Sequence, residues 1–73
     1  MLNLEDYEKD PLWPILVETV HAMIMYKNHL AYTRDTVIHE DTEISPPELS
    51  AKLGIPLGEA IVILHELRIK EKL

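Results

Sequence analysis

The hydrophobic and polar positions of this chain predict three helices, at about residues 11–33, 46–53 and 56–68. In the first, apolar residues recur every three or four positions and form two stripes. One stripe contains Leu12, Leu16, Val20, Met23 and Leu30, and the other contains Trp13, Val17 and Ile24. Such a helix is apolar on more sides than two short helices can cover. We therefore expect it to pack against a second copy; the alternative is a central helix in a compact monomer.

The two shorter helices have clear boundary signals. Ser45 and Glu48 have the spacing of a capping box, and Gly54 suits a left-handed position at the end of a helix. Pro56 is well placed to begin the next helix. The buried face of that third helix is expected to contain Ala60, Ile61, Leu64 and Leu67.

The remaining segments complete a single predicted domain at residues 11–73. Residues 1–10 are expected to form an acidic, flexible leader, and the polar residues 34–43 a loop or a short irregular strand. Ile44 then precedes the Ser-capped helix. The order of these features, most sharply over residues 44–67, resembles the winged helix-turn-helix superfamily. The resemblance implies an all-α fold, or a mainly α fold with one very short strand at Ile44, arranged as a three-helix winged-helix-like bundle with the wing absent or truncated.

Composition and charge narrow the functional classes. The 73-residue chain contains no cysteine, which excludes disulfides and thiolate metal sites. No signal peptide or membrane-spanning segment is predicted, and a cytoplasmic location is expected. The formal charge is −6, and residues 1–44 hold nine acidic against three basic residues. Nucleic-acid binders rely on basic surfaces, so this charge disfavours DNA or RNA as the partner.

The side of the third helix away from its predicted core suggests a protein contact. We expect the exposed residues there to be Glu59, Val62, Ile63 and Glu66. Carboxylates and aliphatic groups cannot donate hydrogen bonds to bases or phosphates, whereas an apolar centre with a charged edge is typical of protein interfaces. The alternative is that Val62 and Ile63 pack inside the domain, under residues 34–43. Candidate DNA contacts are restricted to Arg68, Lys70 and Lys72.

No catalytic set or cofactor motif is found, and we do not predict an enzyme. His21 and His29 lie about 12 Å apart along a continuous helix, too far to share a metal ion within one chain. The sequence therefore predicts a small protein-interaction or regulatory adaptor with a protein partner. It is expected to self-associate as a dimer through Trp13, Val17 and Ile24. A dimeric DNA-binding transcriptional regulator is the first alternative, and a structural subunit of a larger complex is the second.

Overall fold

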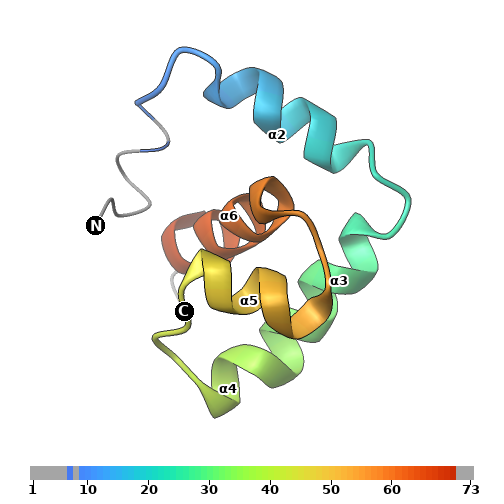
Figure 1. Cartoon of the computed structure of the whole chain (residues 1–73), viewed down its shortest axis with the longest axis vertical. Coiled ribbons are helices and arrows are strands. Elements are labelled where there is room, and N and C mark those ends of the chain that lie inside the picture. The colour runs from blue at the N-terminus through green and yellow to red at the C-terminus, as the bar shows by residue number, and fades with distance from the viewer. Residues whose placement is uncertain (1–6, 8, 71–73) are drawn as a thin grey trace.

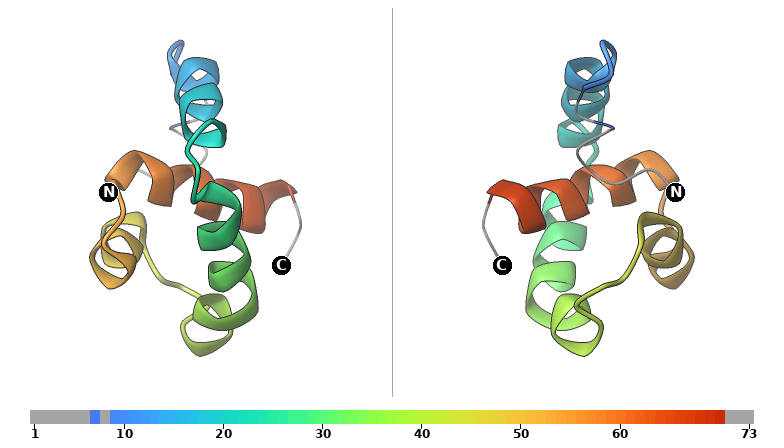
Figure 2. Two further views of the ribbon diagram at one scale, coloured as in Figure 1. Left: turned by 90° about the vertical axis from the view of Figure 1, so that its right-hand side faces the viewer. Right: turned by 90° about the vertical axis from the view of Figure 1, so that its left-hand side faces the viewer.

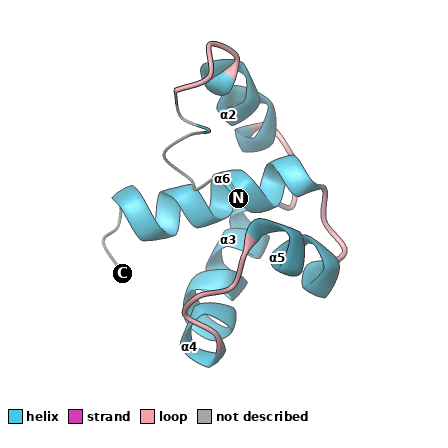
Figure 3. Ribbon diagram, turned by 60° about the vertical axis from the view of Figure 1, so that its left-hand side comes forward, coloured by secondary structure: helices cyan, strands magenta, loops and turns pink. Residues whose placement is uncertain are grey.

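The computed structural model describes Tyr7 and residues 9–70, without the side chains of residues 69 and 70, and this part of the chain is helical with no strand (Figure 3). The helices are α2 (Trp13–His21), α3 (Tyr26–Tyr32), α4 (Ile38–Glu40), α5 (Pro46–Leu53) and α6 (Leu57–His65). Two π-helical segments, η1 (Thr33–Val37) and η2 (Glu66–Lys70), join α3 to α4 and extend α6. The described residues thus form four helical bodies (Figure 1). The all-α prediction is confirmed, whereas the short strand expected at Ile44 is absent from the described residues.

The α5 helix and the turn after it follow the predicted pattern. The Ser45 hydroxyl accepts a hydrogen bond from the Glu48 N–H at 3.3 Å, and the Ser45 N–H donates to the Glu48 carboxylate at 2.9 Å. The bonds from the Ser45 backbone and side chain hold the pKa of the Glu48 carboxyl below its usual value. Gly54 ends the helix with φ 67° and ψ 34°, a left-handed conformation that glycine adopts without a Cβ clash.

The predicted long first helix is wrong, because it is broken at residues 22–25. The first half is α2, and the second half begins at Tyr26 and continues through η1 and α4 to Glu40. Val20 and Tyr26, on the two sides of the break, are both buried in the core. The break lets both halves fold over α6, so the apolar sides of both can be buried within one chain.

The predicted loop at 34–43 is helical as far as Glu40, which is a second correction. Thr33 and Val37 lie four residues apart and are both fully buried, and Ile38 is buried beside them. Val37 and Ile38, β-branched residues of the segment expected to be a loop or a short strand, therefore lie on the inner side of a helix. Packing has overridden their modest preference for extended structure.

The α6 helix lies at the centre of the molecule. Figure 2 shows it crossing between α2 on one side and the rod of residues 26–40 on the other, with α5 beside its first turn. A β-carbon added at Gly58 would lie only 3.1 Å from Cδ1 of Leu16, so α2 packs directly over the start of α6. Because neighbours cover several sides of α6, its apolar residues form the middle of the core.

The N-terminal region agrees with the prediction in part. Helix α2 begins at Trp13, two residues after the predicted start, and the Asp10 carboxylate accepts a hydrogen bond from the Leu12 N–H at 2.8 Å. Most of the predicted leader lies outside the described residues. Tyr7, however, lines a cavity of about 150 Å³ together with Asp10, Leu12, Trp13 and Leu16. None of the described helices combines the length and the apolar character needed to cross a lipid bilayer.

Candidate functional site

The side of α6 that we expected to be exposed is inside the protein. Val62 and Ile63 are fully buried, and Glu59 is 1% exposed. The prediction that these residues and Glu66 form a free interaction face is therefore wrong. The reason is the break at residues 22–25, which brings α2 and α3 over this side of α6. The burial of Val62 and Ile63 agrees instead with the alternative that they pack inside the domain.

Glu59 forms the first of two acid–histidine pairs on α6. Its Oε2 atom lies 2.6 Å from Nδ1 of His29, which comes from α3. The Glu59 side chain is completely shielded from solvent, whereas that of His29 is 29% exposed. The other carboxylate oxygen, Oε1, is buried without a hydrogen-bond partner among the described residues. A buried carboxylate with one unsatisfied oxygen is costly, so Glu59 depends strongly on His29.

Glu66 forms the second pair, two helical turns further along. Its Oε1 atom lies 2.5 Å from Nε2 of His21 and accepts a hydrogen bond from the Tyr26 hydroxyl at 2.6 Å. The three residues come from the end of α2, the start of α3 and the extension of α6. Glu66 therefore ties together the two halves of the predicted first helix. It is not the exposed surface residue that the sequence suggested.

Replacing Glu66 by alanine should destabilise the protein by about 1–3 kcal/mol, the cost of removing an acceptor from partly buried polar groups. A truly exposed glutamate would change stability by less than about 0.5 kcal/mol. Urea denaturation followed by circular dichroism measures the difference. Glu18→Ala is the matched control, because Glu18 is an exposed glutamate on α2. Equal midpoints for the two variants would contradict the role assigned to Glu66.

These pairs were missed by sequence reasoning, although a spacing signal exists. His21 and His29 are separated by eight residues, and Glu59 and Glu66 by seven. The glutamate interval is close to two helical turns, which puts both glutamates on one side of α6 and its extension, whereas the histidine interval crosses the break at residues 22–25. The histidines were considered only as metal ligands. The described residues contain no group of three or more histidine or acidic side chains that could hold a metal ion.

The three residues predicted for self-association have different environments. Trp13 and Val17 are partly buried and pack against the core, and the Trp13 ring meets the buried His65 ring edge-on with 4.8 Å between centroids. Ile24, in the break between α2 and α3, is 94% exposed. Only Ile24 of the three is therefore available to a partner in this structure.

Large exposed hydrophobic side chains concentrate near α2. They include Leu12 just before α2, Ile15 on α2, and Ile24 and Met25 in the turn that follows α2. Leu12 and Ile15 are three residues apart and lie on the same side of the helix. We call these four residues the α2 surface. Tyr32 and Leu57 are about half exposed elsewhere. Clustered exposed apolar residues are typical of contact sites, whereas single ones are common on any protein.

The candidate DNA-contact residues do not form a described basic patch. The Arg68 guanidinium donates a hydrogen bond to the Thr42 carbonyl oxygen at 2.9 Å. Partial burial lowers the pKa of Arg68, while nearby Asp41 and Glu43 act in the opposite direction. Arg68 thus fastens the loop before α5 to the end of α6. The Lys70 side chain and Lys72 lie outside what the structure describes.

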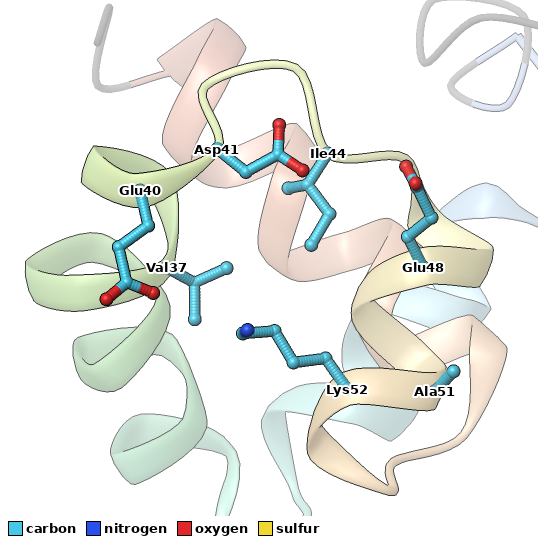
Figure 4. A pocket seen from close by; sticks show the side chains of 7 residues that line it. All are labelled: Val37, Glu40, Asp41, Ile44, Glu48, Ala51 and Lys52. Atoms are coloured by element: carbon cyan, nitrogen blue, oxygen red, sulfur yellow. The ribbon is translucent and has the colours of Figure 1, made fainter.

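A shallow cavity of about 420 Å³ lies between α4 and α5 (Figure 4). Its lining residues are Val37, Glu40, Asp41, Ile44, Glu48, Ala51 and Lys52. The Lys52 side chain extends across the cavity from α5 toward Val37. The acidic residues at the rim are exposed, and Glu48 is already engaged by Ser45. The cavity is thus mainly a gap between surface side chains.

Comparison with known proteins gives no further identification: no family model, no curated protein and no solved structure matches this chain.

Proposed function

We propose that this protein is a small helical interaction module that self-associates through the α2 surface. The observation that carries the proposal is the exposure of Leu12, Ile15, Ile24 and Met25 within one short segment, beside a core in which α6 is almost completely buried. Contact with a second copy would remove these apolar groups from water. The broader role as a regulatory adaptor, which the sequence suggested, rests on this same surface.

The chemistry around the α2 surface suits a protein partner. This surface provides four large exposed apolar side chains, and the exposed Asp10 and Glu18 are polar residues close to them in sequence. Protein–protein interfaces combine apolar groups with polar ones at their edges. A second copy presents the same surface and can form a two-fold symmetric contact. A chain of this size also has a small core, and additional burial in a dimer would increase its stability.

The arrangement of α6 favours a protein contact over DNA binding. Helix α5, the Gly54 turn and α6 form a helix-turn-helix, the part of the chain that carries the winged-helix resemblance. In DNA-binding members of such folds, the second of these helices enters the major groove. Here that helix is covered by α2 and α3, and Arg68 is bonded to Thr42. A role as a DNA-binding transcriptional regulator and a structural role in a larger complex stay predictions. No described feature of the structure favours either of them.

Replacing Ile24 by aspartate should give a folded monomer. Because Ile24 is almost fully exposed, the new charge needs no burial in the monomer, but it opposes burial between two copies. Ile15→Asp should act in the same way. Analytical ultracentrifugation at micromolar concentrations measures the mass, and circular dichroism checks the fold. Ala51→Asp is the control, because it adds the same charge at an exposed position on α5, outside the α2 surface. A wild-type protein that sediments as a monomer would refute self-association.

A further inference from the structure

We propose that two copies of the protein associate by exchanging α2, so that the α2 helix of each copy packs on α6 of the other. Residues 22–25 would straighten and join α2 to α3 in one continuous helix. This inference rests on the proposed self-association, and of the α2 surface it places Ile24 at the contact between the two copies. It also assigns the partner copy a role in one of the two acid–histidine pairs, because His21 on one chain would then meet Glu66 on the other.

The break between α2 and α3 has no cause in its own sequence. Residues 15–45 contain neither glycine nor proline, and the break includes Ala22, Met23 and Met25, which all favour helices. At the two ends of the break the backbone is already close to helical, with φ −84° and ψ −8° at Ala22 and φ −91° and ψ 4° at Met25. Rotations of roughly 35–45° in ψ would give these two end residues typical α-helical values. Tertiary packing, and not local preference, therefore keeps the turn bent.

Within the described residues, the bent turn also lacks two backbone hydrogen bonds that a continuous helix would have. The N–H groups of Ile24 and Met25 have no backbone hydrogen-bond partner among the described residues. In a continuous helix they would donate to the carbonyls of Val20 and His21. The Ile24 side chain lies almost entirely in water. Two straightened helices that cross near this point would cover the Ile24 side chains of both copies.

Exchange would preserve the contacts that hold α2 in place. These contacts are the His21–Glu66 pair, the Trp13–His65 ring contact and the close approach of Leu16 to Gly58. Each connects α2, before the turn, to α6, after it. All can therefore re-form between two chains, which is why exchange of an element is a low-cost route to a dimer.

A straightened chain would need a second copy as its partner, because its long helix extends beyond its own folded body. A continuous helix from residue 13 to residue 40 would be about 42 Å long at 1.5 Å per residue. The folded body measures 32 Å along its longest axis. The α2 end of such a helix would project beyond its own body, away from its own α6. The apolar side of α2 and the uncovered side of α6 would then both need a partner, and a second copy supplies both.

The substitutions Ile24→Ala and Ile24→Gly provide a matched test. Both remove the isoleucine side chain, so a contact made by that side chain is lost equally in the two variants. They differ in helix preference, because alanine favours a helix more than glycine does. For each chain, the equilibrium constant for straightening residues 22–25 should therefore be about fivefold larger in the alanine variant. A dimer contains two copies of this segment, so its association constant should be roughly 25-fold larger for Ile24→Ala than for Ile24→Gly. Equal association constants, measured by sedimentation equilibrium, would overturn the exchange.

Cross-linking gives an independent test, because the chain contains no cysteine of its own. In the variant His21→Cys with Glu66→Cys, a short bismaleimide should join two chains of an exchanged dimer and give a covalent dimer on a denaturing gel. In the control variant, Thr42→Cys with Arg68→Cys, both cysteines follow the turn and should be linked within one chain. Both pairs are in contact in the wild-type protein.

The two tests separate the inference from the function on which it rests. If the wild-type protein dimerises but the His21/Glu66 cysteine pair is linked only within single chains, exchange is wrong and self-association through the α2 surface stands. If the protein is monomeric at every concentration, both fail. Exchange is supported if the His21/Glu66 cysteine pair gives covalent dimers and the Thr42/Arg68 pair does not. It also requires that Ile24→Ala dimerises more strongly than Ile24→Gly.

Discussion

Replacing Leu64 by alanine is expected to remove about 2–5 kcal/mol of folding stability, the range for buried leucines whose site cannot collapse fully. Leu64 is fully buried in α6, the helix against which the other helices pack. A domain of this size has a total stability on the order of 4–11 kcal/mol, from about 0.05–0.15 kcal/mol per residue. The Leu64→Ala variant should therefore unfold at a much lower urea concentration than the wild-type protein, or be partly unfolded without urea. Urea denaturation followed by far-ultraviolet circular dichroism gives the measurement.

Leu57→Ala is the control for this substitution. It changes the same residue type in the same helix, but the Leu57 side chain is about half exposed. Its cost should be well below that of Leu64→Ala, since surface substitutions usually change stability by about 0.5 kcal/mol or less. Similar losses in the two variants would show that α6 is not the central helix, and the register of its buried residues would have to be revised.

Replacing His29 by leucine should cost about 3–5 kcal/mol, because it leaves the buried carboxylate of Glu59 without its partner. The value should lie near the lower end of this range, since the His29 side chain is 29% exposed and water can approach the vacated site. The other oxygen of Glu59 already lacks a partner among the described residues, so the carboxylate has no second bond to retain. Thermal and urea denaturation of the variant measure the loss.

A double substitution separates the pair from the packing around it. Changing Glu59 to methionine together with His29→Leu replaces both polar groups by apolar ones of similar size. Stability should then return to the wild-type level or exceed it, as is common when buried ion pairs are replaced by hydrophobic residues. His39→Leu, at an exposed histidine on α4, should have little effect. If the double variant is as unstable as His29→Leu alone, the unpaired carboxylate is not the cause.

The parts of the fold that were predicted correctly have strong local signals. The bounds of α5 follow from Ser45, Glu48 and Gly54, whose hydrogen bonds and backbone conformation depend on residues close in sequence. The expected buried residues of α6, including Ala60 and Leu64, are also confirmed. Their spacing of three and four residues identifies one side of the helix without knowledge of its neighbours.

The parts that were predicted wrongly depend on contacts between distant segments. Residues 22–25 favour helix locally, and only the packing of α2 and α3 on α6 bends the chain there. The burial of Glu59 depends on His29, and that of Glu66 depends on His21 and Tyr26. A glutamate is normally an exposed residue, so helical spacing assigned both to the surface. Of the three residues predicted for self-association, only Ile24 is exposed, because Trp13 and Val17 pack against their own core.

The central position of α6 has a consequence for the order of events on the ribosome. Of the described helices it leaves the exit tunnel last, yet α2, α3 and α5 all pack around it. Until α6 emerges, the earlier helices have amphipathic surfaces and no core to join. Folding would therefore begin only when nearly all of residues 9–70 have been made, with the earlier segments exposed to other nascent chains in the meantime. Neighbouring chains on one polysome are identical, so the first available partner for an unpaired α2 would be another copy of this protein.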